Sequence, residues 1–170
     1  MRSLRHRRGQ PADTGASAVE FALVVPLLLL LVFGIIQFGM TFGQILALNN
    51  ASRQGARAGV VGLNTCDTVM GQVYQGSLGA IALKYPLTVT VSRSGSGGGT
   101  VCKAMVNMSG SSYAASYTAG SATTVACPAG NAANTLSVGT SSTTSFTIPP
   151  FFFISNYVVS GNGVFQCEIG

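Results

Sequence analysis

The sequence carries little charge. Only 8% of its 170 residues are charged, whereas soluble domains average about 25%, and tryptophan is absent. Four acidic residues and one histidine leave too few groups for acid–base or nucleophilic catalysis, so we do not expect an enzyme. The net charge is +5, but much of it lies in the first residues, so we do not expect a nucleic-acid partner either.

Residue groups that hold cofactors are also missing. His6 is the only histidine, and the sequence has no Cys-x-x-Cys pair, so a zinc site is not expected. The glycine-rich stretch 95–99 lacks the lysine and the following helix of a phosphate-binding loop. We therefore predict that the chain binds neither a cofactor nor a metal.

One long apolar segment dominates the N-terminal part of the chain. Phe21 to Ile36 contains no charge, and residues 16–42 are long enough to cross a bilayer, which takes about 20 helical residues. Pro26 predicts a kink or a local loosening of this helix. Residues 1–15 form a basic leader, which predicts a cytoplasmic N-terminus and an exported remainder. We therefore expect one pass through a membrane. The leader contains Arg2, Arg5, Arg7 and Arg8.

The helix is expected to extend outside the membrane over residues 43–62. Small residues recur at every fourth position, which places them on one ridge of the helix surface. Such a ridge lets another helix approach closely, and its partner is either another subunit or a downstream helix of this chain. This small-residue stripe consists of Gly39, Gly43, Ala47, Ala51, Gly55 and Gly59.

A second pair of residues, Arg53 and Arg57, is also spaced by four and lies on another face of the same helix. The two side chains are either solvated or in contact with acidic partner residues or lipid head groups.

The four cysteines all follow the apolar segment. An even number of cysteines in an exported domain predicts two disulfides, for which three connectivities are possible. The alternative is four buried free thiols. The candidates are Cys66, Cys102, Cys127 and Cys167.

Residues 63–170 predict a small head, so that the fold class is α+β: a long transmembrane helix, a second helix and an antiparallel sheet. Residues 109–145 have no clear periodicity and are expected to form a loop with at most one short strand. Pro149 to Phe153 packs into the core or forms a contact patch for a partner. The second helix is expected at Cys66–Leu83, a strand hairpin at Leu87–Arg93 and Val101–Met108, and further strands at Thr144–Ile148 and Val164–Ile169.

Glu20 is the most unusual residue of the membrane segment. A carboxylate just inside an apolar helix is disfavoured by roughly 2.5–3.5 kcal/mol on insertion scales, so a membrane protein needs a reason to keep one there. The simplest alternative is a carboxylate that reaches back to the lipid head groups.

The residues from Gly15 to Phe21 resemble a class III signal of the type IV pilin superfamily. The longer pattern is similar to the TadE-like family of tight-adherence (Tad/Flp) pilus assembly, in which GAxAVEFALVxPLLLLLxxGIxxFG leads into NAxRxGARA. Here these segments are Gly15 to Gly39 and Asn50 to Ala58. Phe21 stands where major pilins of this system commonly have tyrosine, and those pilins are much shorter, which favours a minor pseudopilin.

The resemblance implies a function and a set of partners. A prepilin peptidase would cut between Gly15 and Ala16, and Glu20 would set the register of neighbouring subunits. The partners would be that peptidase, other pilin or pseudopilin subunits, the Tad machinery and membrane lipid. The chain would lie in a bacterial cytoplasmic membrane with its head outside the cytoplasm, or at the cell surface in a pilus. The family motif contributes Asn50, Arg53, Gly55 and Arg57.

Two other functions fit the same residues. A permanently anchored single-pass protein would keep its leader and bind an envelope component through its head. A secreted domain released by an ordinary signal peptidase fits less well, because the apolar run is too long and no A-x-A site ends it.

Overall fold

The computed structural model describes residues 13–81, 83–95, 98–109, 112–128, 134–145 and 156–168. The chain divides into two compact units, residues 1–36 and residues 37–170. Helix α1 (Asp13–Val60) supplies residues to both. It remains helical through Pro26, and its observed end at Val60 agrees with the helix end expected near Gly59.

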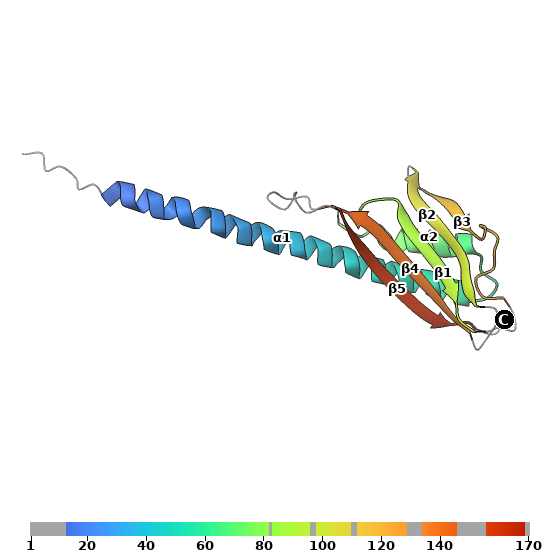
Figure 1. Cartoon of the computed structure of the whole chain (residues 1–170). Coiled ribbons are helices and arrows are strands. Elements are labelled where there is room, and N and C mark those ends of the chain that lie inside the picture. The colour runs from blue at the N-terminus through green and yellow to red at the C-terminus, as the bar shows by residue number, and fades with distance from the viewer. Residues whose placement is uncertain are drawn as a thin grey trace, which may run out of the picture. The chain divides into compact units, whose positions relative to one another are not determined.

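The second unit contains one antiparallel sheet of five strands (Figure 1). Its strand order is β3-β2-β1-β4-β5, so β3 and β5 form the two edges. The α+β fold class with a second helix and an antiparallel sheet is confirmed. The strands are β1 (Leu87–Arg93), β2 (Gly99–Ser109), β3 (Ser112–Ala119), β4 (Thr135–Thr144) and β5 (Tyr157–Gln166).

Strand register shows which side chains share a face. Val89 lies opposite both Ala104 and Thr140, and the same row ends in Tyr117 on β3 and Gly161 on β5. Since directly opposite residues point to the same face, this row belongs to one side of the sheet. We call it the helix face, because α2 (Cys66–Ser77) and residues 37–60 of α1 contact it through Tyr117 and Thr140, respectively.

The hydrophobic core lies between the helices and the helix face. Strand β1 alternates buried Leu87, Val89 and Val91 with half-buried hydroxyl residues, which is the expected period of two for a strand with one covered face. Helix α2 contributes Val69, Met70, Val73 and Tyr74 to this core. The opposite side of the sheet, the open face, is lined mainly by serine and threonine.

Two disulfides close the head, as the cysteine count predicted. Cys66 at the start of α2 is bonded to Cys102 on β2, and Cys127 is bonded to Cys167 after β5. The structure thereby selects one of the three connectivities. All four cysteines are buried in the core.

The second helix is shorter than expected, because it ends at Ser77 rather than at Leu83. The Leu78 N–H donates to the Gln75 carbonyl at 3.3 Å, and the Ala80 N–H donates to the Ser77 carbonyl at 3.0 Å. Hydrogen bonds between residues three apart tighten the last turn and end the helix.

The prediction of a loop over residues 109–145 is wrong, because β3 and β4 lie there. Strand β4 has the burial pattern of an ordinary strand, but Thr140, Ser142 and Thr144 take buried positions that usually hold apolar residues. Hydroxyl residues on both faces hid its alternation from the sequence.

The last strand was also misplaced. It begins at Tyr157 instead of Val164 and ends at Gln166, while Thr144 is the end of β4 rather than the start of another strand. Residues 146–153, which include most of the expected strand Thr144–Ile148 and the whole segment Pro149 to Phe153, lie outside the described residues. The hairpin of Leu87–Arg93 with the next strand is confirmed.

Candidate functional site

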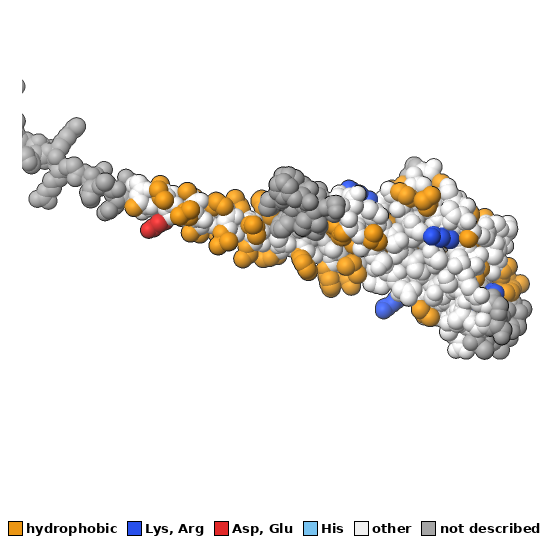
Figure 2. Space-filling model, viewed as in Figure 1, with side chains coloured by type: hydrophobic (Ala, Val, Ile, Leu, Met, Phe, Trp, Pro, Cys, Tyr) orange, Lys and Arg blue, Asp and Glu red, His pale blue; other side chains and the backbone are white. Residues whose placement is uncertain are grey.

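The candidate site is helix α1, which carries every residue of the resemblance. From Val19 to Ile36 most of its large apolar side chains are exposed, among them Phe21 at 70% and Leu23 at 74%. Figure 2 shows these hydrophobic side chains along the visible side of the helix. By length and composition α1 can cross a membrane. One such N-terminal helix is compatible with single-pass anchoring.

Glu20 and the expected cleavage position lie at the beginning of this helix. Gly15, Ala16 and Glu20 are all helical, and the Glu20 side chain is exposed. A Cβ atom built on Gly15 would meet nothing within 4 Å. Packing within the described part of the chain therefore does not require glycine at position 15.

The small-residue stripe has two different surroundings. A Cβ atom on Gly39 or Gly43 would meet nothing within 4 Å, whereas one on Gly55 would lie 2.5 Å from Cγ2 of Val73. Ala51 is fully buried, and Gly76 of α2 approaches it so closely that an added Cβ would lie 2.8 Å from the Ala51 Cα. For Ala51 and Gly55 the partner is thus the chain's own downstream helix.

The remaining stripe positions fit the same division. Ala47 is half-buried, and Gly59 is buried against Val69 of α2 and Leu136 of β4. The stripe changes along α1 from an open surface at Gly39 to a packed seam at Gly59.

A second row of α1 residues, also spaced by four, runs along β5. The Thr41 hydroxyl is 2.8 Å from the Tyr157 hydroxyl. The row continues with Ile45 and Asn49, and the Oδ1 of Asn49 accepts a hydrogen bond from the Asn162 N–H at 3.1 Å. Near Arg53, a Cβ atom on Gly163 would lie 2.6 Å from the helix backbone. Helix α1 and strand β5 therefore run side by side in the same direction.

A buried hydroxyl pair fixes the helix against the centre of the sheet. The hydroxyls of Ser52 and Thr140 share a hydrogen bond at 2.8 Å, and the Leu48 carbonyl oxygen accepts from the pair, lying 2.8 Å from the Ser52 hydroxyl oxygen and 3.3 Å from that of Thr140. Ser52 is completely buried. Because buried polar groups must find partners, this pair selects one position of the helix on the sheet.

The family motif residues divide between these two surfaces. Asn50, Arg53 and Arg57 are exposed, while Gly55 is buried in the seam. The motif thus combines a small side that lets α1 seat on the head with a basic side that faces solvent.

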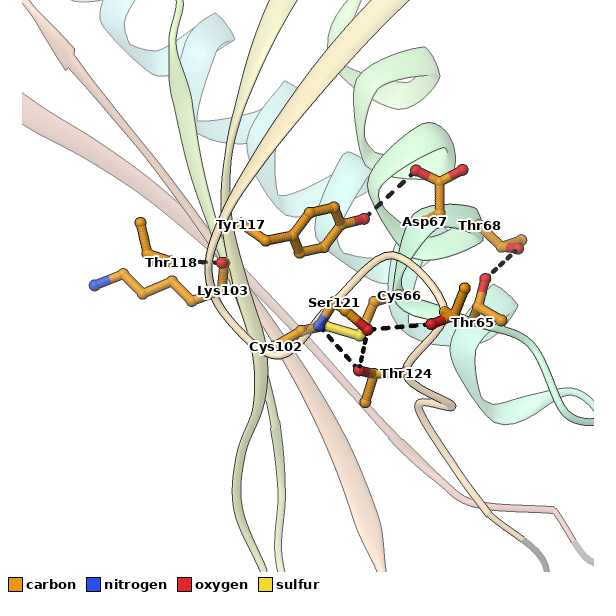
Figure 3. Close-up of a disulfide and its surroundings, with 11 residues drawn as sticks. Thr65, Cys66, Asp67, Thr68, Cys102, Lys103, Tyr117, Thr118, Ser121 and Thr124 are labelled. Carbon is orange, nitrogen blue, oxygen red and sulfur yellow. Dashed lines mark hydrogen bonds between the residues drawn. A yellow bond between two sulfur atoms is a disulfide. The ribbon is translucent and has the colours of Figure 1, made fainter.

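The Cys66–Cys102 disulfide joins the start of α2 to the sheet (Figure 3). The first N–H groups of α2 are satisfied from a neighbouring segment, since Cys66 donates to the Thr124 carbonyl at 2.8 Å and Asp67 donates to Ala122 at 3.1 Å. A helix start needs such partners because its first N–H groups have none within the helix. The bond and these contacts together hold α2 on the helix face.

Asp67 accepts hydrogen bonds from two tyrosine hydroxyls of β3. The Tyr113 hydroxyl donates to the Asp67 carbonyl at 3.0 Å, and the Tyr117 hydroxyl donates to its carboxylate at 3.4 Å, as Figure 3 shows for Tyr117. Burial, and after it the charge of Asp67, raises the pKa of both phenols. Within the described residues, no three side chains that could ligate a metal come together.

Sequence reasoning missed the residues on which α1 is seated. Gly161 and Gly163 lie on the helix face of β5, where a Cβ atom would overlap the backbone of α1 at Leu48 or Ser52. The signal was present in the alternation of Gly161, Asn162 and Gly163 within a segment of otherwise strand-like residues. Glycines two apart in a strand mark the close approach of another backbone.

Comparison with known proteins supports the identification of the helix. Residues 15–57 match the family model described as TadE-like protein. No curated protein and no solved structure matches the chain. The match spans α1 from Gly15 to Arg57, and thus both the apolar part and the motif seated on the head. The resemblance to the TadE-like family is confirmed, and residues 15–57 link this chain to Tad pilus assembly.

Proposed function

We propose that the protein is a minor pilin-like component, a pseudopilin, of a Tad-type pilus assembly system. A prepilin peptidase would process it between Gly15 and Ala16, and it would pack through the N-terminal part of α1. Its partners would be other pilin or pseudopilin subunits, the Tad machinery and membrane lipid. In this proposal the head is extracytoplasmic, and the chain has no catalytic role.

The observation that carries the proposal is the position of the family match. It begins at Gly15, the residue after which the peptidase would cut, and it includes the acidic residue five positions later. The helix that follows exposes most of its large apolar side chains, and such a surface has to be covered by lipid or by other helices.

Processing would give Glu20 a partner. Hydrolysis of the bond between Gly15 and Ala16 leaves a carboxylate on the leader and an ammonium group on Ala16. In a stack of subunits, Glu20 of one chain could pair with the Ala16 ammonium of its neighbour. Breaking a buried ion pair is unfavourable by roughly 3–5 kcal/mol, so the pair would favour one axial register. Cleavage also removes the leader arginines, which hold the N-terminus at the cytoplasmic side.

The structure offers a clean variant with which to test processing. In Gly15→Val the added side chain has room, so folding of the head should not change. We expect this variant to accumulate as the full-length chain in the native membrane. Removal of the leader from Gly15→Val at the wild-type rate would contradict cleavage at this bond.

Glu20→Ala separates this proposal from the permanently anchored alternative. A pseudopilin should still insert in the membrane and be processed, but it should lose its incorporation into fibres. Glu20→Asp, which keeps the carboxylate at the same exposed position of α1, is the matched control and should retain incorporation. A permanent anchor would retain Arg2 to Gly15 and would be indifferent to Glu20→Ala, because its partner would bind the head.

A further inference from the structure

The two edges of the sheet are protected to different degrees. An edge strand presents unpaired N–H and C=O groups to which another strand can bind, and proteins usually cover such an edge or place charged residues or proline on it. In this sheet the edges are β5 and β3, and they can be compared residue by residue.

The β5 edge is guarded by α1. Asn49 accepts the hydrogen bond of the Asn162 N–H, which takes up a donor that β4 does not use. Exposed Arg53 and Arg57 follow on the same row of the helix. Val159, Gly161 and Gly163 are buried, so this strand is covered on its helix face from Val159 to Gly163. Burying two arginines beneath a further strand would be unfavourable without acidic partners.

Among the residues that the structure describes, the β3 edge has neither a covering helix nor charged residues or proline. Its sequence, Ser112 to Ala119, contains neither a charged residue nor a proline, and no residue of the strand is buried. The one irregularity is a register shift near Thr118, which leaves Ser112 to Tyr117 in unbroken register with β2. Six consecutive residues of β3 therefore form a regular and uncharged edge, in which exposed residues alternate with half-buried ones.

We propose that the β3 edge accepts an extended strand from a different protein. The added strand would be uncharged over about six residues, because β3 offers no charged side chain to pair with, and the carboxylate nearby, that of Asp67, already accepts a hydrogen bond from Tyr117. On the helix face it would carry aromatic or small side chains next to Tyr113 and Tyr117, since cross-strand aromatic pairs stabilise sheets. Main-chain hydrogen bonds would supply the affinity, and the pattern of side chains would supply the specificity.

A second copy of this chain fits the edge less well. Antiparallel pairing of β3 with itself requires a two-fold axis perpendicular to the sheet, and this axis reverses the direction of α1. Copies that share one membrane need α1 to point the same way. Head-to-tail pairing of β3 with β5 of the next copy would meet Arg53 and Arg57. The edge is thus suited to a different protein, whose strand would become the last strand of the sheet.

The first experiment compares the two edges in the native cell with the full-length chain. A photoreactive benzoylphenylalanine replaces either Ser116 of β3 or Ser160 of β5, both of which are exposed on the open face of an edge strand. We expect the Ser116 variant to form an adduct with a second protein, mapped by mass spectrometry to an extended uncharged segment, and the Ser160 variant to form at least tenfold less. An adduct of two copies of this chain, equal adducts at both positions, or no adduct would overturn the proposal.

A pair of proline variants tests whether the backbone makes the contact. Neighbouring N–H groups of an edge strand alternate between the sheet and the outside, so one of Ala114→Pro and Ala115→Pro removes a bond to β2 and the other removes only an outward donor. Thermal unfolding of the purified chains identifies the harmless variant. That variant should reduce the Ser116 adduct at least tenfold, and an unchanged adduct would overturn strand addition. The proposal is independent of leader processing, since a permanently anchored head would present the same edge.

Discussion

The two parts of helix α1 have different surroundings although they belong to one helix. From Gly15 to Ile36 the helix belongs to the first compact unit, and most of its large apolar side chains are exposed. From Gln37 to Val60 it is seated on the head by Ala51, Gly55 and the hydroxyl of Ser52. The second part has its packing partners within the head, whereas in the proposed function the first part is covered by lipid or by other subunits.

This comparison gives the small-residue stripe two separate roles. Around Gly55 a small residue is needed because α2 lies against the helix backbone. Around Gly39 and Gly43 the surface is open, and it adjoins exposed Phe38 and Phe42. In the proposed function, only this open part of the stripe is free for helices of other subunits.

Removing a disulfide should give the largest effect and should separate the two parts of α1. The Cys66–Cys102 bond spans 36 residues, and the loop-entropy model assigns such a bond about 4 kcal/mol. Cys102→Ser should therefore lower the unfolding free energy of the head by about 4 kcal/mol, as measured by urea unfolding of the chain in detergent. Helicity from residues 15–36 should persist after the head unfolds. Simultaneous loss of all helical signal would contradict the division.

Gly163→Val should loosen the seat of α1 on the sheet. Its side chain would overlap the backbone at Ser52 and Arg53, and backbone cannot move aside as a side chain can, so we expect a loss of about 3 kcal/mol. Gly139→Val is the control, since a Cβ at this strand glycine meets only the Thr90 carbonyl oxygen at 3.9 Å. Equal unfolding midpoints for the two variants would show that α1 is not seated on β5.

A matched pair within the stripe should sharpen the comparison. Gly55→Val places a side chain against Val73, and we expect a loss of about 2 kcal/mol. Gly43→Val has open space and should stabilise the helix slightly, by about 0.4 kcal/mol, because valine forms helices better than glycine. Thermal unfolding of the head distinguishes them. A loss at Gly43 as large as that at Gly55 would mean that the stripe is packed along its whole length.

The smallest effect should come from alkaline pH. Burial and Asp67 raise the pKa of Tyr113 and Tyr117 in the folded head, so these phenols favour the protonated form more when folded than when unfolded. Their contribution to stability is fully present below the ordinary tyrosine pKa of about 10 and is lost as the pH rises through the folded values. The midpoint of urea unfolding should fall above pH 10, and Tyr117→Phe should weaken this fall. An unchanged pH dependence in that variant would exclude Tyr117 as its source.

Elements with a regular local pattern could be predicted from the sequence, whereas contacts between distant segments could not. The helix to Gly59, the strand Leu87–Arg93 and the two disulfides follow from apolar runs, alternation and cysteine count. Strand β4 was missed because threonine at position 140 replaces an apolar residue with a hydroxyl, and its partner Ser52 is 88 residues away. Gly161 and Gly163 have no side chains that could reveal a face, and only the adjacent backbone of α1 explains them.

The residues of the candidate site could be predicted for a different reason. Gly15, Glu20 and the Asn50 to Ala58 segment form a pattern along the sequence itself, so the resemblance could be recognised without knowledge of the fold. The division of the stripe between Gly43 and Gly55 could not be seen in the same way, because both glycines have the same spacing and similar neighbours. Only the position of α2 distinguishes them.

The most direct test of the proposed function is the N-terminus of the protein isolated from its native membrane, determined by intact mass and N-terminal peptide sequencing. The proposal predicts a mature chain that begins at Ala16, with Gly15 and the arginines before it removed. A chain that retains Arg2 to Gly15 would contradict the proposal and would identify the protein as a permanent single-pass anchor.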